Sequence, residues 1–237
     1  MEAVILDIEG TICPIAFVKE TLFPYFLKKA PKVLKNLSYP LKSDTADKYT
    51  NVLCQFPLES IVSYDKLISH IENLVKNDIK DHVLKSFQGL IWQHGYDQGE
   101  LTAPIYDDAI EFIMALKRKS KKIYIYSSGS IKAQLLLFKH VKRGDEVLDM
   151  TDYLSGYFDL VTIGNKYEGS SYSKILKEIN YENKAKDVLF LTDNIHEADA
   201  AISAGMQSKI VYRLGNPALD EESKKFDVIY SLDELKI

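Results

Sequence analysis

Two carboxylates one residue apart, Asp7 and Glu9, follow an apolar run at the start of the chain, in the stretch AVILDIEGT. Three later apolar runs are also followed by residues that can take part in chemistry. These are Ser127, Ser128 and Gly129 after KIYIY, Lys166 after DLVTIG, and Asp193 with Asn194 at the end of DVLFLTDN. Their shared position at the ends of apolar runs predicts that they form one site.

The residue types in this set favour transfer of a phosphoryl group. Carboxylate oxygens suit Mg²⁺, a lysine and serine hydroxyls can hold phosphate oxygens, and an ionised carboxylate can act as a nucleophile. The set contains no His or Cys, which argues for Mg²⁺ over zinc. Two acids at a strand end are more often a solvated loop or a helix cap, so the inference depends on all these groups occurring together.

Five apolar runs have the composition of strands buried on both faces: residues 3–7, 122–127, 159–164, 187–193 and 208–213. Unalternating β-branched and aromatic runs are typical of a parallel sheet covered on both faces. Segments with a helical pattern, such as IKAQLLLFKHV and YSKILKEINY, separate the last four runs. The sequence therefore predicts an α/β fold with a doubly wound, mostly parallel, Rossmann-like sheet, which binds ligands at the carboxyl ends of its strands.

A long helical segment separates the first predicted strand from the second. Its helical patterns cover residues 18–37, 63–79 and 82–96, and an amphipathic pattern at 105–119 leads back to the sheet. A helical insertion fits this order better than two tandem domains. We expect a core domain of residues 1–11 and 105–237 and an inserted helical domain of residues 12–104.

The composition excludes several classes of protein. The 237 residues have a formal net charge of −4, and the lysines lie scattered among acids, so nucleic acid is a poor partner. The two cysteines, Cys13 and Cys54, have no zinc-ligand spacing and indicate no disulfide scaffold. No leader is visible and no apolar stretch reaches the ~18 to 20 residues of a membrane helix. We expect a soluble intracellular protein without a membrane partner.

Four motifs of the chain resemble the ordered motifs of the haloacid dehalogenase-like hydrolase superfamily. They are DIEGT, YSSG, Lys166 followed six residues later by Tyr172, and LTDN followed by EADAAISAG. The resemblance spans nearly the whole chain, and the helical insertion stands where that superfamily carries a mobile cap. More narrowly, DIEGTIC, IYIYSSGSIKAQ, SSYSKI and the segment GLIWQHGYDQGEL resemble the enolase-phosphatases of the methionine salvage pathway.

The resemblance implies a role for each residue of the phosphate site. Asp7 would attack phosphorus and carry an aspartyl phosphate, because a carboxylate near Mg²⁺ is a competent nucleophile. Ser127, Ser128 and Lys166 would hold the phosphate. The implied substrate is 2,3-diketo-5-methylthiopentyl-1-phosphate, a small phosphorylated diketone that is enolised and then dephosphorylated to an acireductone.

The resemblance also implies one Mg²⁺ per chain, held by Asp7, the backbone carbonyl of Glu9 and Asp193. Most phosphatases of the superfamily have Asp at the position of Glu9, where it serves as general acid and base. The glutamate is longer by one methylene and agrees with the narrower family. We hypothesise that Glu9 also takes part in the proton transfer of enolisation.

Simpler roles compete at several of these positions. Ser128 could be the N-cap of the helix that follows, and Lys174 competes with Lys166. Three roles are open for Asn194, Glu197 and Asp199: metal ligand, neighbour that supports a metal ligand, or residue at a helix start that complements the helix dipole. The helix-dipole role is preferred for Glu197 and Asp199. Further candidates for substrate contact or support are Gly129, Trp92, His94, Tyr96 and Glu100, although aromatic residues at helical spacing more often belong to a core.

Three other functions remain open from sequence. The chain could hydrolyse another small phosphate ester, it could be a phosphomutase, or it could be an inert member that binds a partner. The presence of Asp7, Ser127, Lys166 and Asp193 together speaks against an inert member. We expect a monomeric hydrolase of the cytoplasm, with nuclear residence left open.

Overall fold

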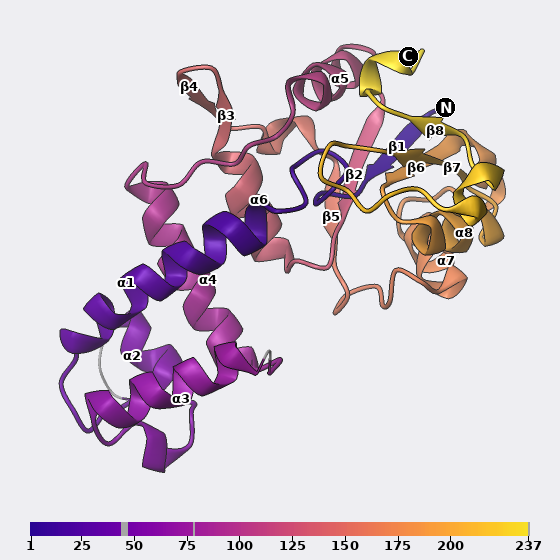
Figure 1. Ribbon diagram of the computed structural model, residues 1–237. Helices are drawn as coiled ribbons and strands as arrows, with labels where there is room; N and C mark the ends of the chain where they lie inside the picture. The colour runs from indigo at the N-terminus through magenta and orange to yellow at the C-terminus, as the bar shows by residue number, and fades with distance from the viewer. Residues whose placement is uncertain (44–46, 78, 237) are drawn as a thin grey trace. The chain divides into compact units, whose positions relative to one another are not determined.

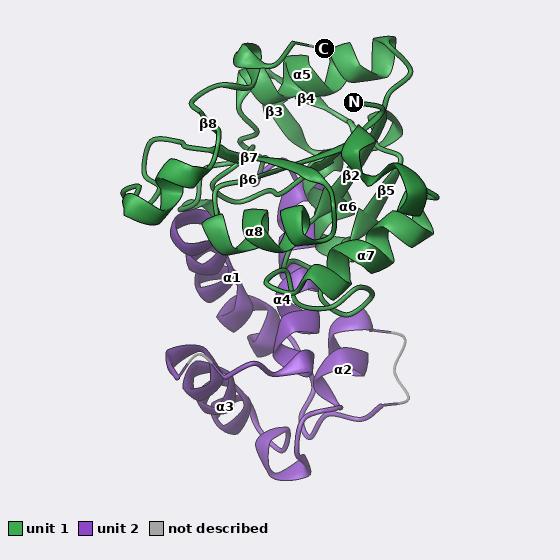
Figure 2. Cartoon of the chain, turned by 90° about the vertical axis from the view of Figure 1, so that its right-hand side faces the viewer, with its two compact units in different colours: residues 1–17, 102–237 green, residues 18–101 purple. Residues whose placement is uncertain are grey.

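The computed structural model describes residues 1–43, 47–77 and 79–236 and is shown in Figure 1. The chain divides into two compact units, which Figure 2 colours separately: unit 1 is residues 1–17 with 102–237, and unit 2 is residues 18–101. The sequence predicts boundaries after residues 11 and 104, whereas the structure places them after 17 and 101. Ile12 and Cys13 are fully buried, and the Ile12 carbonyl accepts a hydrogen bond from the Tyr106 amide at 2.9 Å within unit 1.

Unit 1 contains a six-stranded sheet in which every pair of neighbouring strands is parallel. The strand order is β5-β2-β1-β6-β7-β8. The strands are β1 (Ala3–Leu6), β2 (Lys122–Tyr126), β5 (Gly156–Phe158), β6 (Val188–Thr192), β7 (Gln207–Val211) and β8 (Val228–Ile229). In the centre, Ile5 lies beside Tyr124 on β2 and Phe190 on β6. This confirms the predicted α/β class with a parallel sheet.

Helices cover both faces of this sheet, with α5 (Asp107–Arg118) and the pair α7 (Gly169–Glu178) and α8 (Ile195–Ser203) on opposite sides (Figure 1). Ala3 and Ile5 point toward α7 and α8, where they pack in one core with Phe190 and Tyr172. Because successive strand residues alternate between faces, Val4 and its neighbours point the other way. Burial on both faces explains why β1 is uniformly apolar.

The prediction of a strand at residues 159–164 is wrong. The third strand of the core is the preceding segment, β5, and residues 160–163 form turns. The Asp159 carboxylate accepts hydrogen bonds from the amides of Val161 and Thr162 at 3.0 and 2.9 Å, which closes a local turn in place of a strand ladder. Its other oxygen accepts a hydrogen bond from the Ile131 amide at the start of α6 (Ile131–Lys139).

Several short elements of unit 1 have no counterpart in the sequence prediction, because segments of two to six residues carry too little periodicity. They are the antiparallel hairpin of β3 (Val141–Arg143) and β4 (Glu146–Leu148), the strand β8, and 3₁₀ helices at Thr151–Tyr153, Glu182–Asp187, Glu221–Lys225 and Leu232–Glu234. The last of these begins with a capping box between Ser231 and Glu234.

Unit 2 is helical, as its sequence patterns indicate. It consists of a π-helix (Val18–Leu22), α1 (Phe23–Lys35), α2 (Lys48–Leu53), a 3₁₀ helix (Leu58–Ser60), α3 (Tyr64–Lys76) and α4 (His82–Asp97). Asp47, Ser63 and Asp81 cap the starts of α2, α3 and α4 with their side chains. Phe26 and Phe87 meet edge to face in its core. Position 78, inside the segment predicted as helical, lies outside the described residues.

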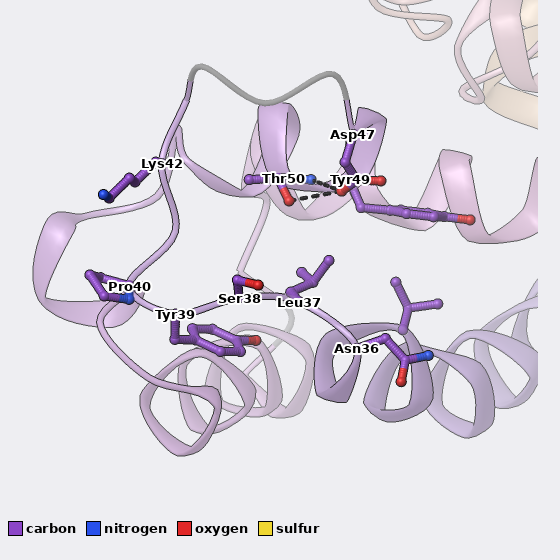
Figure 3. A pocket seen from close by; sticks show the side chains of 10 residues that line it. Asn36, Leu37, Ser38, Tyr39, Pro40, Lys42, Asp47, Tyr49 and Thr50 are labelled. Atoms are coloured by element: carbon purple, nitrogen blue, oxygen red, sulfur yellow. Dashed lines mark hydrogen bonds between the residues drawn. The ribbon is translucent and has the colours of Figure 1, made fainter.

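Unit 2 also contains an open cavity of about 690 Å³, shown in Figure 3. Leu37, Tyr39 and Tyr49 line it, together with Thr50, whose amide donates to the Asp47 carboxylate at 2.7 Å. None of the residues predicted for the site lines this cavity. Separately, no helix in the described parts of the chain is long and apolar enough to cross a membrane.

Candidate active site

The three central strands of the sheet bring Asp7, Ser127 and Asp193 to the same edge. Each of these residues directly follows the last residue of β1, β2 or β6. The strand pairing continues into them, since the Asp7 amide donates to the Leu191 carbonyl at 2.9 Å and the Ser127 amide to the Phe158 carbonyl at 3.2 Å. Because all strands are parallel, β1, β2 and β6 end at the same side of the sheet (Figure 1), which places these three residues together at its carboxyl end.

Lys166 lies between two carboxylates in the buried part of this site. Its ammonium is 2.6 Å from Asp7 Oδ1 and 2.7 Å from Glu197 Oε2, and the residue is only 6% exposed. The Tyr172 hydroxyl donates to the Lys166 carbonyl at 2.8 Å and so fixes the loop that carries the lysine. Lys174 is exposed and donates instead to a backbone carbonyl. The structure therefore brings Lys166, and not Lys174, to Asp7.

Glu197 is the site residue that the sequence interpretation missed. It is buried in the first turn of α8 and accepts hydrogen bonds from Lys166 and from the Thr192 hydroxyl, the latter at 2.7 Å. Asp199, which had the same assignment, is exposed and pairs with Lys225. The sequence pattern that could have indicated Glu197 is its place on the apolar face of the helix. It shares the buried side of α8 with the alanines at 198, 200 and 201. A carboxylate on an apolar face needs a partner.

Ser127 joins Glu9 to the loop that precedes α6. Its hydroxyl donates to Glu9 Oε2 at 3.3 Å and accepts from the Gly129 amide at 3.1 Å. Ser128 is exposed, and it is not the cap of the helix that follows, because Ser130 caps α6 by accepting from the Ala133 amide. A role for Ser128 in phosphate binding stays a prediction.

Four acids and one lysine set the electrostatics of the site. Burial, and next the Asp7 carboxylate, raise the pKa of Glu9. The same two causes raise the pKa values of Asp193 and Glu197 to about 7. Burial alone would lower the pKa of Lys166, but Asp7 and Glu197 outweigh it and raise this pKa. Four carboxylates near a single ammonium leave an excess of negative charge, which a divalent cation would offset.

Gly10 brings the backbone of Glu9 and Gly10 against the Asp193 carboxylate. A β-carbon on Gly10 would lie 2.3 Å from Asp193 Oδ2, so no larger residue fits, and the backbone has a φ of +79° that favours glycine. Within the described ranges, no three His, Cys, Asp or Glu side chains are grouped to hold a metal ion. A set made of the Asp7 and Asp193 carboxylates and the Glu9 backbone carbonyl does not require such a group. These oxygen donors fit Mg²⁺.

The remaining predicted residues have identifiable structural contacts. Asn194 caps α8, accepting from the His196 amide at 3.0 Å, and its side-chain amide donates to the Tyr167 hydroxyl at 3.4 Å. Gly129 contributes the amide that contacts Ser127. Neither contact tests a role toward substrate, which stays a prediction for both residues.

The candidates from the helical insertion make contacts inside unit 2. The Trp92 indole donates to the Leu22 carbonyl at 2.8 Å, and Tyr96 is buried. Glu100 accepts from the Tyr25 hydroxyl at 2.9 Å and pairs with Lys29. These contacts stabilise the unit, and substrate contact by Trp92, Tyr96 or Glu100 stays a prediction.

Comparison with known proteins places this site in a family. A family model described as haloacid dehalogenase-like hydrolase matches residues 1–205. The chain is 55% identical to the enolase-phosphatase E1 of Debaryomyces hansenii, covering all of this chain and 97% of the relative. It is 52% identical to the enolase-phosphatase E1 of Candida albicans, covering all of this chain and 96% of the relative.

Solved structures give the same result. The UTR4 protein of Saccharomyces cerevisiae superposes with a TM-score of 0.86 at 41% identity, and the match covers 99% of each chain. CbbY from Rhodobacter sphaeroides, solved in complex with phosphate, has a TM-score of 0.60 at 12% identity and shares the fold. The chain therefore belongs to the haloacid dehalogenase-like hydrolases and, among them, to the enolase-phosphatase E1 family.

Proposed function

We propose that this chain is a bifunctional enolase-phosphatase of methionine salvage. It enolises 2,3-diketo-5-methylthiopentyl-1-phosphate and then removes the phosphate to give the acireductone. The observation that supports this most is the buried Asp7–Lys166 ion pair beside Glu9 and Ser127, in a chain that matches enolase-phosphatase E1 proteins over its full length.

Asp7 is the nucleophile of the dephosphorylation. Its carboxylate forms an O–P bond while the bond between phosphorus and the substrate oxygen breaks. A water then attacks phosphorus, the aspartyl O–P bond breaks, and free phosphate leaves with the Asp7 carboxylate restored. Lys166, 2.6 Å from Asp7 Oδ1, and the Ser127 hydroxyl stabilise the charge that develops on the phosphoryl oxygens.

Glu9 moves the protons. Its raised pKa favours the protonated form that can donate to the leaving oxygen, after which the carboxylate can accept a proton from the attacking water. In enolisation, the same carboxylate removes a proton from the carbon next to a carbonyl and the proton is returned to the enolate oxygen. The hydrogen bond from Ser127 orients Glu9 Oε2 toward the phosphate loop.

One Mg²⁺ per chain completes the proposal, held by the carboxylates of Asp7 and Asp193 and the Glu9 carbonyl. When bound, the ion supplies positive charge that offsets the buried acids and polarises phosphate and carbonyl oxygens. The close approach of Asp193 to Gly10 and the excess of carboxylates over lysine support this assignment.

The role of unit 2 and the setting of the reaction are part of the same proposal. Unit 2 is inserted directly after β1, where the superfamily carries its cap, and we assign it that role. The net charge of −4 supports a small-molecule substrate over nucleic acid. The enzyme acts as a monomer in the cytoplasm, and the nucleus is a second compartment to examine.

The experiment mixes purified protein with Mg²⁺ and the diketo phosphate and follows enol absorbance and free phosphate together. We expect the enol signal to precede phosphate release, and an Asp7→Asn variant to release no phosphate. Phosphate release without an enol signal, or a clear preference for another ester in a panel of phosphate esters, would overturn the enolase assignment.

A further inference from the structure

The segment that follows β7 holds the turn that carries the catalytic acids. The Asn216 side-chain amide donates to the Gly10 carbonyl at 2.9 Å, and Arg213 Nε donates to the Thr11 carbonyl at 2.8 Å. The backbone amide of Asn216 donates to the Arg213 carbonyl, and this hydrogen bond closes residues 213–216 into a turn. The side chains of Arg213 and Asn216 thus restrain two consecutive carbonyls, those of Thr11 and Gly10, from more than 200 positions further along the chain.

Among the described residues, the hydrogen bonds to the turn at residues 8–13 leave one carbonyl out. They end on the carbonyl oxygens of Ile8, Gly10, Thr11, Ile12 and Cys13. The carbonyl outside this network is that of Glu9, which the proposed function assigns to Mg²⁺. Its peptide is fixed at the other end, because the Gly10 amide donates to the Cys13 carbonyl at 2.8 Å. Pairing of the neighbouring carbonyls keeps the Glu9 oxygen available in one orientation.

Asn216 compensates for the freedom of glycine at this point. Gly10 has the widest range of backbone conformations of any residue type, and its φ of +79° is not enforced by a side chain. Its amide is held by Cys13 and its carbonyl by Asn216, so the two bonds together fix both sides of its α-carbon. Without Asn216, the carbonyl side of Gly10 would lose this restraint.

The oxygen of the Asn216 amide lies on the Asp193 side of Gly10. A β-carbon placed on Gly10 would be 2.3 Å from Asp193 Oδ2 and 3.3 Å from Asn216 Oδ1, so both oxygens face the same side of the glycine. Asn216 Oδ1 is buried and has no hydrogen-bond partner among the described residues. A buried amide oxygen without a donor is costly, which indicates that a donor occupies this place in the working enzyme.

Arg213 makes the supporting segment rigid. The residue is 7% exposed, its Nη1 is 2.8 Å from Asp108 Oδ2, and its guanidinium lies over the Tyr106 ring at 4.6 Å. Asp108 also accepts hydrogen bonds from Ser231 and Leu232. The base of the turn that carries Asn216 is therefore anchored to α5 and to the carboxyl-terminal 3₁₀ helix.

We propose that Asn216 is a positioning residue of the Mg²⁺ site. Its amide nitrogen fixes the Gly10 carbonyl and thereby the orientation of the neighbouring Glu9 carbonyl, while its amide oxygen accepts a hydrogen bond from a water held beside Asp193. The inference rests on the proposed function, since it takes the Mg²⁺ ligands from there. Asn216 lies beyond residues 1–205, the region that the family model matches.

The test measures the Kd of Mg²⁺ by calorimetry for the full-length wild type, Asn216→Ala and the similarly sized Asn216→Leu. Groups that orient metal ligands change metal affinity about 10- to 100-fold when removed, so we expect Mg²⁺ to bind at least about tenfold more weakly to both variants. Binding of inorganic phosphate without Mg²⁺ should stay within about twofold, because Ser127 and Lys166 are untouched. Leu214→Ala is the control, since Leu214 lies in the same segment and is 98% exposed.

A purely structural role gives a different result. If Asn216 only stabilised the loop, phosphate and Mg²⁺ binding would weaken together with the melting temperature, and the inference would be overturned. An unchanged Kd for Mg²⁺ in both variants, or the same loss in Leu214→Ala, would also overturn it. Failure of the wild type to enolise or hydrolyse the diketo phosphate would refute the proposed function alone, because the Mg²⁺ titration needs no substrate.

Discussion

At the scale of single residues, the geometry of the site depends on the Lys166 ammonium, which pairs with two carboxylates. Lys166 contacts both Asp7 and Glu197, so the proposed nucleophile is held in place by a cation that also pairs with a second carboxylate. The sequence indicated Asp7 from its place after a strand, and Lys166 from its place after an apolar run and six residues before Tyr172. It could not indicate Glu197 as strongly. An acid in the first turn of a helix is common without any role in a site, because it interacts favourably with the helix dipole.

Replacing Lys166 by methionine tests this arrangement. The variant removes the charge that we propose stabilises the phosphoryl oxygens, and we expect kcat for phosphate release to fall at least about 100-fold. Lys174→Met is the matched control, because Lys174 is exposed and its ammonium donates to the Ile163 backbone carbonyl and not to a site carboxylate. The measurement is steady-state phosphate release with circular dichroism of both variants. Equal activity in the two variants would contradict the role of Lys166.

Shortening Glu9 to aspartate tests whether one carboxylate serves both reactions. The acid would be withdrawn by one methylene, and a displacement of about 1 Å can cost about 100-fold in rate. We expect Glu9→Asp to enolise a non-hydrolysable analogue of the diketo phosphate at least about tenfold more slowly than the wild type. Enol absorbance is the readout. A normal rate of enolisation would limit Glu9 to the phosphate chemistry.

At the scale of elements, long apolar runs were predictable and short irregular ones were not. The runs at β1 and β6 are buried throughout, those at β2 and β7 are buried at their carboxyl ends, and their composition alone indicates a parallel sheet. The run at 159–164 has the same composition, but the Asp159 side chain takes the amides that a strand would pair. Local competition of this kind is not visible in apolar periodicity.

The ion pair of Asp108 and Arg213 ties three elements together and gives a pH prediction. Burial tends to raise the pKa of Asp108, but hydrogen bonds from Arg213 and the Leu232 amide lower it overall from its usual 3.8. A carboxylate with a lowered pKa stabilises the fold above its unfolded-state pKa, and this contribution is lost as the pH falls through the folded-state pKa.

We therefore expect Asp108→Asn to reduce the free energy of unfolding by about 2 kcal/mol at neutral pH, as for a hydrogen bond to a charged group. The difference from the wild type should shrink as the pH falls below 3.8. Urea unfolding at several pH values measures it, with the neighbouring exposed Asp107→Asn as control. A difference that does not depend on pH would show that the charge of Asp108 contributes nothing.

At the scale of the whole molecule, the excess of buried acids predicts that divalent cations stabilise the fold. A ligand that binds only the folded state stabilises it by about 2.7 kcal/mol at 100 times its Kd. We expect Mg²⁺ to raise the melting temperature of the wild type by several degrees, at about 2–4 °C per kcal/mol for a chain of this size. EDTA should reverse the shift.

Asp193→Asn should lose this thermal shift, because it removes one of the proposed ligands. Asp199→Asn should keep it, since Asp199 is exposed and pairs with Lys225. Differential scanning fluorimetry with and without Mg²⁺ compares the three proteins. A full shift in Asp193→Asn would show that Mg²⁺ binds elsewhere.

The position of β1 in the sheet also sets the order in which the protein can fold during synthesis. In the described parts of the chain β1 pairs with β2 and β6, which begin at Lys122 and Val188, so neither partner strand has been synthesised while residues 7–121 leave the ribosome. Unit 2 has its own apolar core and is complete once residue 101 has emerged. At about 5–20 residues per second, β1 waits several seconds unpaired. The strand that carries the proposed nucleophile is therefore an apolar segment that stays unpaired in the nascent chain after unit 2 has been synthesised.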